Sequence, residues 1–193
     1  MRNLKHPLLI FMLIMAYIPM NAQNGFLVNE KSSVVVFGTS TIHDWEINCE
    51  QLSGTAKIEL SEAGIADIPS LQFVVIVKGM ESGKGLMNSK TYDALKEDEH
   101  PTIKYKLSEL KDKTSNTNGF YTMKAIGLLT IAGKTQTISH DVMAHVSGKE
   151  VVFSGEYLLD MTTYDVDPPT AMMGTIKTGK DVTIKFKTTY SIN

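Results

Sequence analysis

The amino-acid sequence predicts an all-β protein in which eight or nine antiparallel strands close into one barrel. Three observations lead to this fold class. Apolar and polar side chains alternate along most of the chain, and turn signals separate the alternating segments. The chain also has no room for the helical crossovers that parallel neighbours need, so the strands must be antiparallel. Closure into a barrel removes exposed strand edges.

The predicted strands run from residue 33 to residue 187. In one of them Ile103, Tyr105 and Leu107 point to one face, and Lys104 and Lys106 point to the other. The same alternation predicts strands at 33–38, 43–49, 54–60, 71–77, 102–107, 120–131, 136–146, 150–159 and 182–187. Reversals are predicted at Ser53-Gly54, Ala63-Gly64, Asn118-Gly119, Ala132-Gly133 and Ser147-Gly148.

Two stretches interrupt the alternation, and we expect both near one end of the barrel. Residues 79–100 are rich in glycine at first, and Asn88 or Ser89 can then cap a short helix. Residues 160–180 form a loop that is too long for a hairpin turn. Long loops of this kind in compact domains are usually functional or mobile.

Residues 1–22 have the pattern of a secretory signal peptide. Arg2 and Lys5 give a positive start, an apolar run follows at 8–18, and Ala22 offers a small residue for cleavage. The run is too short for a stable membrane anchor. The alternative is a short buried helix. We therefore expect a periplasmic or secreted protein whose single domain spans 23–193.

Composition limits the partners of this domain. Loss of residues 1–22 removes two basic and no acidic residues, which leaves 171 residues with 17 basic and 21 acidic side chains and a net charge of −4. A chain with this negative net charge is not expected to attract the phosphates of nucleic acid. Cys49 is the sole cysteine and cannot form an internal disulfide; a small buried hydrophobe is the favoured interpretation and a reactive thiol the alternative.

Four segments resemble the YceI-like family and occur in the family's order. They are Phe37 with Thr39 to Trp45, Met87 to Pro101, Gly127 to Thr135 with the sequence GLLTIAGKT, and Asp160 to Pro169 with its paired prolines. Together they extend over nearly all of residues 26–190. One departure is Asn88, where many members carry Asp, so any role of that charge is in doubt here.

The resemblance implies an extended eight-stranded, lipocalin-like barrel in the periplasm or outside the cell. For some members it also implies a long polyisoprenoid ligand, such as a quinone tail or a prenyl phosphate, inside the barrel. We expect an isoprenoid or other long-chain lipid as partner, held for transport or storage. A transient membrane contact and a homodimer are both compatible with this role. No cofactor is expected.

The predicted ligand-binding residues face the barrel interior or lie on the short helix. They are His43, Trp45, Phe73, Val75, Val77, Met87, Tyr92, Leu95, Ile103, Tyr105, Leu129, Ile131, Phe153 and Tyr157. The interior set is apolar, so it requires hydrocarbon from side chains or from a ligand. Periodicity cannot measure empty volume, and a solid barrel that acts as an interaction module is therefore an alternative.

Enzymatic activity is the other alternative, although the sequence does not favour it. It has no G-x-S-x-G, H-E-x-x-H or P-loop motif, but a hydrolase triad can be assembled from distant segments. No metal site is predicted, because zinc ligands usually come in closely spaced pairs. His140 and His145 are five residues apart, which places them on opposite faces of a strand.

Overall fold

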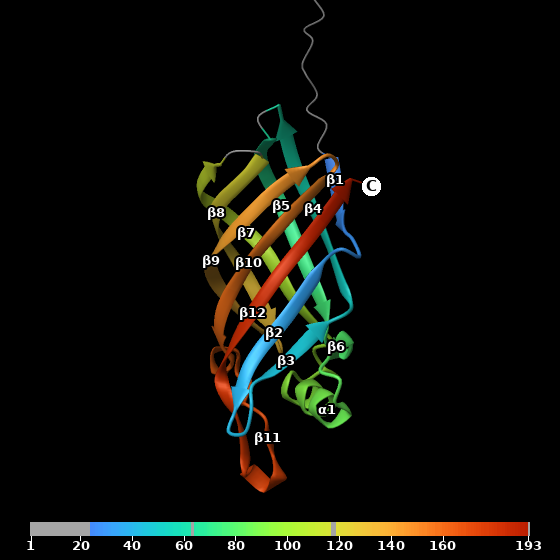
Figure 1. The fold of residues 1–193 in the computed structure, drawn as a ribbon, viewed down its shortest axis with the longest axis vertical. Helices are drawn as coiled ribbons and strands as arrows, with labels where there is room; N and C mark the ends of the chain where they lie inside the picture. The colour runs from blue at the N-terminus through green and yellow to red at the C-terminus, as the bar shows by residue number, and fades with distance from the viewer. Residues whose placement is uncertain (1–23, 63, 117–118, 193) are drawn as a thin grey trace, which may run out of the picture.

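The computed structural model describes residues 24–62, 64–116 and 119–192, which form an antiparallel barrel (Figure 1). In this part of the chain the wall has eight positions. Six are single strands: β5 (Gly64–Ile76), β7 (Thr102–Ser115), β8 (Phe120–Ile131), β9 (Lys134–Ser147), β10 (Glu150–Asp160) and β12 (Ile176–Ile192). The other two are interrupted strands: β1 (Asn24–Val28) with β2 (Ser33–Ser40), and β3 (Trp45–Cys49) with β4 (Leu52–Ser61). The predicted fold class is confirmed. The predicted signal peptide lies outside the described residues.

Strand β12 closes the barrel because it has neighbours on both sides. Ile184 pairs with Tyr157 of β10 on one side and with Val36 of β2 on the other. Further along, Tyr190 pairs with Val28 of β1. Strand β1 also pairs with β4, so hydrogen bonding continues around the whole wall.

Two predictions about the first strands were wrong. Strand β1 was not expected, and Ser53-Gly54 is not a reversal, since both residues lie within β4. Strands β3 and β4 follow one another along the same position of the wall, with a break at 50–51. Gly54 is needed because a Cβ there would lie 2.5 Å from the carbonyl oxygen of Gln72 on β5. Here glycine marks a close backbone approach rather than a turn.

The first true reversal lies between β2 and β3. The hydroxyl of Ser40 donates to the carbonyl oxygen of His43 at 2.7 Å, and β3 begins at Trp45 rather than at residue 43. His43 therefore sits in a turn instead of a strand. The reversal at Ala132-Gly133 is confirmed, because both residues have positive φ.

The remaining predicted reversals join consecutive antiparallel strands. Ser147 pairs with Glu150 across Gly148, as predicted. Ser61 pairs with Gly64, and Ala63 between them lies outside the described residues. Asn118 also lies outside them, before Gly119 and the start of β8.

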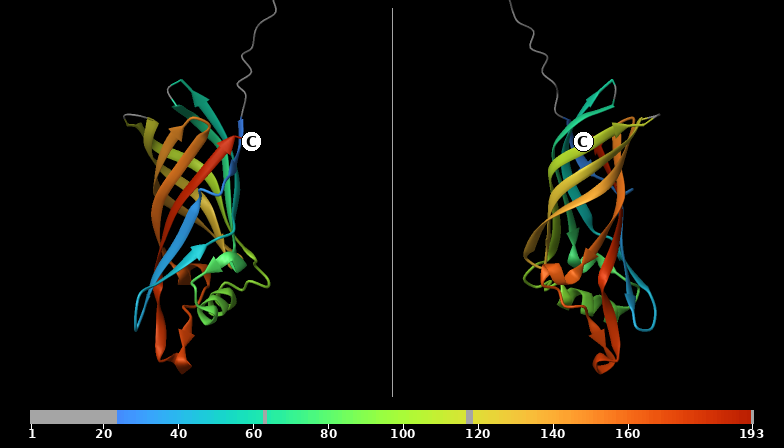
Figure 2. Two further views of the ribbon diagram at one scale, coloured as in Figure 1. Left: turned by 45° about the vertical axis from the view of Figure 1, so that its right-hand side comes forward. Right: turned by 90° about the vertical axis from the view of Figure 1, so that its left-hand side faces the viewer.

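The two ends of the barrel differ in packing. One end, where β1 meets β4 and β12, is filled by a cluster in which Phe26, Ile58, Val151 and Tyr190 have no exposed surface. At the other end lie the short helix α1 (Gly85–Ala94), beside the wall, and β11 (Thr170–Ala171), which forms the β11 hairpin with the start of β12 and extends beyond the other strands (Figure 2). The two irregular stretches of the sequence thus share one end.

The helix α1 follows a short connection from β5, formed by the 3₁₀ helix η1 (Val77–Gly79) and β6 (Met80–Glu81). It begins at Gly85, so the predicted caps Asn88 and Ser89 lie inside it. The side chain of Asn88 instead accepts hydrogen bonds from Ser82 and contacts the carboxylate of Glu81. It fixes the helix to β6.

Candidate ligand-binding cavity

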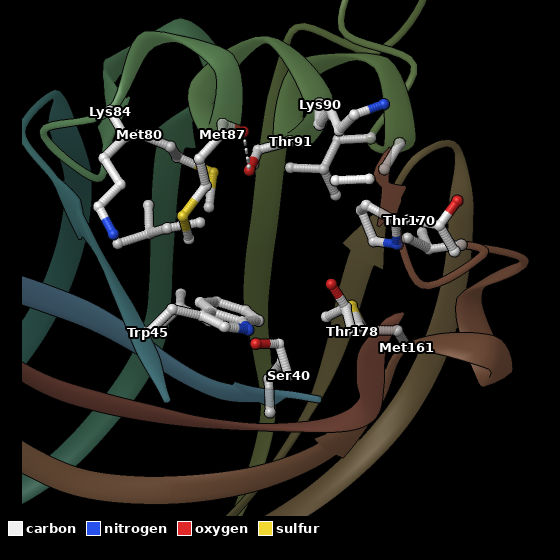
Figure 3. Close-up of a pocket in the computed structure, with 18 of the residues that line it drawn as sticks. Ser40, Trp45, Met80, Lys84, Met87, Lys90, Thr91, Met161, Thr170 and Thr178 are labelled. Carbon is white, nitrogen blue, oxygen red and sulfur yellow. Dashed lines mark hydrogen bonds between the residues drawn. The ribbon is translucent and has the colours of Figure 1, made fainter. Parts of the chain in front are cut away.

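An apolar cavity of about 300 Å³ lies at the end of the barrel that carries α1. Strands β2 and β3 supply one side of it, and α1 covers another. Met87 reaches from the helix toward Trp45 on β3 (Figure 3). We call this space the outer chamber. Its volume alone reaches the lower range of small-molecule sites, about 300–1,000 Å³.

A second cavity, of about 170 Å³, lies among strands β5, β7, β8, β9, β10 and β12. We call it the inner chamber. Among the described residues its lining contains no Lys, Arg, Asp or Glu. Five residues line both chambers: Val36, Met80, Ile103, Ile131 and Ile184. We call this shared set the neck, because the same side chains line both chambers and the two chambers are therefore adjacent inside the barrel.

Most predicted ligand-binding residues line these chambers. The outer chamber is lined by His43, Trp45, Met87 and Leu95, the inner one by Phe73, Val75, Tyr105, Leu129, Phe153 and Tyr157, and both by Ile103 and Ile131. That these side chains bind a ligand stays a prediction.

Val77 and Tyr92 line neither chamber. Val77 follows the end of β5 and lies in η1. The alternation from which we predicted an inward side chain at this position therefore ends before it. Tyr92 extends from α1 to the neighbouring backbone, where its hydroxyl donates to the carbonyl oxygens of Lys78 at 3.1 Å and Met80 at 3.2 Å. Its hydroxyl anchors the helix beside the cavity.

Aromatic rings on the inner face lie over glycines of the neighbouring strands. A Cβ at Gly38 would meet the ring of Trp45 at 2.1 Å, and one at Gly127 would meet the ring of Tyr105 at 2.5 Å. The indole nitrogen of Trp45 also donates to the carbonyl oxygen of Thr39 at 2.9 Å. These glycines fix large rings against the wall and leave the centre of the barrel open.

The outer chamber has few polar groups, of which His43, Lys84 and Lys90 are on side chains partly open to solvent and Tyr164 is buried. His43 shares a 2.7 Å hydrogen bond between its Nδ1 and the carbonyl oxygen of Asp44, so this nitrogen is the donor. Lys84 and Lys90 contribute to the lining; the side chain of Lys84 extends into the space beside Trp45 (Figure 3). The Tyr164 hydroxyl is buried without a partner in the described structure, and burial raises its pKa to about 12.

Sequence reasoning missed several lining residues, of which His140 is the most informative. It lies on the inner face of β9 between Ile138 and Val142, and all three line the inner chamber. His145, on the opposite face, stacks on Phe120. The alternation of His140 with two β-branched residues was the signal that could have identified it.

The described residues contain no group of three or more His, Cys, Asp or Glu side chains placed to hold a metal ion. No helix in the same ranges is long and apolar enough to cross a bilayer. Cys49 lines the inner chamber and is buried, which raises the pKa of its thiol to about 12. Its buried state agrees with the favoured interpretation of a small hydrophobe.

The fold and the cavity together define a lipocalin-like β-barrel with an apolar interior. The chain belongs to the YceI-like family, since the model of the YceI-like domain matches residues 26–190. The resemblance noted in the sequence is thereby confirmed. No match was found among curated proteins.

Solved structures with the same fold include three bacterial proteins. BcnA of Burkholderia cenocepacia is 20% identical, with a TM-score of 0.67 over 84% of this chain and 98% of that chain. A polyisoprenoid binding domain from Saccharophagus degradans is 14% identical, with a TM-score of 0.67 over 89% and 99%. The YceI protein of Campylobacter jejuni is 15% identical, with a TM-score of 0.59 over 76% and 84%. At these identities the similarity demonstrates a shared fold.

Proposed function

We propose that this protein binds one long apolar lipid, a polyisoprenoid or a molecule of similar shape, and carries or stores it outside the cytoplasm. The observation that carries the proposal is the pair of apolar chambers that lie next to each other and share the neck residues. A linear hydrocarbon can occupy both, whereas a compact ligand would fill one. The family and the polyisoprenoid-binding relative support a lipid as ligand.

Binding is favoured over catalysis because the inner chamber offers no charged side chain among the described residues. General acid–base chemistry requires a positioned group that exchanges protons near the operating pH. The buried Tyr105 has its pKa raised to about 12 by desolvation, so it stays neutral, and neither its hydroxyl nor the Nδ1 of His140 has the hydrogen-bonded partner of a catalytic pair. A solid interaction module is disfavoured by the empty volume itself.

Mass spectrometry of organic extracts from the natively purified protein tests the proposal. We expect one class of long-chain lipid in an amount close to one molecule per chain. The matched control is protein that has been delipidated, refolded and extracted in the same way. Native protein without lipid, combined with failure of the delipidated protein to take up any polyisoprenoid from vesicles, would refute it.

Export is part of the proposal and rests on the sequence pattern of residues 1–22. Cleavage should follow Ala22 within a residue or two. Intact-mass measurement of protein from the periplasm or medium checks this. A mature chain that retains Arg2 and Lys5 would contradict export by this route.

We further propose that the lipid is loaded by brief contact with a membrane at the outer chamber. Ile42 and Leu86 line this chamber and yet are 62% and 71% exposed, and Met172 and Met173 are exposed on the β11 hairpin at the same end. Exposed apolar side chains gathered at one place mark an interaction surface. We propose a bilayer as the partner of this surface, because a polyisoprenoid is dissolved in the bilayer before the protein binds it.

Vesicle flotation and lipid-transfer rates test this contact. The variant Met172→Ser with Met173→Ser should transfer a fluorescent polyprenol from vesicles several-fold more slowly, with unchanged affinity, because neither methionine lines a chamber. The control is Leu158→Ser, which removes an exposed leucine from the outside of β10. Equal slowing by both variants would exclude a specific membrane surface at the mouth.

A further inference from the structure

The inner chamber contains two polar atoms that no other part of the described chain satisfies. They are the hydroxyl oxygen of Tyr105 and the Nδ1 of His140, both buried and without a partner at full hydrogen-bond geometry, although the backbone of Asp141 lies close enough to act on the His140 ring. Both residues line the chamber. Buried polar groups in folded proteins nearly always have partners, so each exception requires an explanation.

The two side chains face the same small volume. The ring of Tyr105 meets that of His140 edge to face, with centroids 5.7 Å apart. Phe186 and Tyr157 contact His140 from other sides, with centroids 5.6 Å and 6.0 Å away. Gly127 leaves room for Tyr105, since a Cβ there would lie 2.5 Å from its hydroxyl oxygen. The two polar side chains are thus in ring contact within one aromatic pocket.

Both groups are uncharged at neutral pH. Burial raises the pKa of Tyr105 to about 12. Desolvation lowers the pKa of His140, and this outweighs the opposing effect of the Asp141 backbone and carboxylate. Tyr105 therefore presents a hydroxyl donor, and the Nδ1 of the neutral imidazole is a donor or an acceptor according to the tautomer.

We propose that Tyr105 and His140 form a subsite for an uncharged, oxygen-bearing group, such as an alcohol, ketone or amide, at the inner end of the ligand. The lipid then enters with this group first and leaves its hydrocarbon chain through the neck toward the outer chamber. An anionic group does not fit, because no lysine or arginine lines the inner chamber. This inference rests on the proposed function, since it specifies the ligand that the barrel holds.

The experiment compares two ligands with the same carbon skeleton, the isoprenoid alcohol phytol and its alkane phytane. Each is titrated into delipidated protein by displacement of a fluorescent apolar probe. Tyr105→Phe should weaken phytol binding about fivefold to tenfold, the usual effect of one lost hydrogen bond. It should leave phytane binding unchanged, because the phenyl ring keeps its shape over Gly127.

Tyr92→Phe is the matched control, since its hydroxyl lies outside both chambers and bonds to backbone carbonyls. Its effect on affinity should be the same for phytol and phytane, because its hydroxyl lines neither chamber. Thermal melting separates the two variants further. Loss of the partnered Tyr92 hydroxyl should lower the Tm of the empty protein, whereas loss of the unpartnered Tyr105 hydroxyl should leave it unchanged or raise it.

A ketone with the same skeleton gives a second readout. Its carbonyl stretching band should shift to lower frequency in wild type and return toward the value in alkane solvent in Tyr105→Phe. If phytol and phytane bind but Tyr105→Phe changes neither affinity, a trapped water satisfies the two groups and the subsite is refuted. Equal weakening of both ligands would also refute it, by showing an effect of shape. If neither ligand binds to wild type, the proposed function itself fails.

Discussion

Replacement of an isoleucine by tryptophan at two places distinguishes a hollow barrel from a solid one. Ile103 lies in the neck and lines both chambers, whereas Ile58 is fully buried in the cluster at the closed end and lines neither. The added ring volume is the same in both variants. Only its surroundings differ, which makes Ile58→Trp the control for Ile103→Trp.

The two variants should differ in their effect on the Tm. In a filled core, overpacking costs about 1–3 kcal/mol. For a domain of 150–250 residues each kcal/mol lowers the Tm by about 2–4 °C, so Ile58→Trp should lower it by roughly 2–12 °C. At Ile103 the ring can enter empty volume and bury apolar surface, which stabilises by about 25 cal/mol per Å². The Tm of Ile103→Trp should therefore stay constant or rise.

Calorimetry on delipidated proteins measures these shifts, and extraction of native preparations measures the ligand. Ile103→Trp should be folded and free of lipid, because the indole blocks the neck. A Tm that falls as far in Ile103→Trp as in Ile58→Trp would show that the neck is tightly packed. The reasoning from an open interior would then be wrong.

Three further predictions concern single residues. Because burial raises the pKa of Cys49 to about 12, iodoacetamide at pH 8 should alkylate it in urea but not in the native protein, and rapid native labelling would contradict its burial. Folding lowers the pKa of His140, so below about pH 6.5 the unfolded chain binds a proton at this residue that the folded chain does not. The free energy of unfolding should therefore fall as the pH falls. Chemical denaturation between pH 7.5 and 5.5 should show this decrease in wild type and a smaller decrease in His140→Phe. Gly127→Ala should displace Tyr105 and destabilise by about 1–3 kcal/mol, so an unchanged denaturation midpoint would show that the ring moves freely.

The alternation of side chains predicted the barrel because it reports which face each residue occupies. It failed where the backbone departs from a regular strand. Val77 follows the strand pattern in the sequence but lies in a 3₁₀ turn, where it is buried in the core and lines neither chamber. Gly54 looked like a turn residue because glycine serves both reversals and close backbone approaches, and local sequence does not separate the two.

The cavity itself could not be predicted from the pattern. Inward side chains fill the barrel axis or leave it open according to whether their rings point to the axis or lie along the wall. This orientation is decided by contacts between neighbouring strands, which the pattern within one strand does not report. Tyr105 lies flat across Gly127 on the next strand, and Trp45 lies across Gly38. A side chain at either glycine would push the ring toward the centre. The open interior is therefore a property of these pairs rather than of any one strand.

Selection of a ligand by such a barrel must come from groups other than the hydrocarbon chain. A polyisoprenoid that leaves a bilayer for an apolar chamber exchanges one hydrocarbon environment for another, so its chain contributes little net free energy. An alcohol or ketone oxygen, however, loses its hydrogen bonds with interfacial water on entry, and it needs new ones. Tyr105 and His140 are the buried inner-chamber groups placed to supply them. Their removal should therefore change which lipid is bound more than how much lipid is bound, and lipid extracts of Tyr105→Phe should shift toward species without a terminal oxygen.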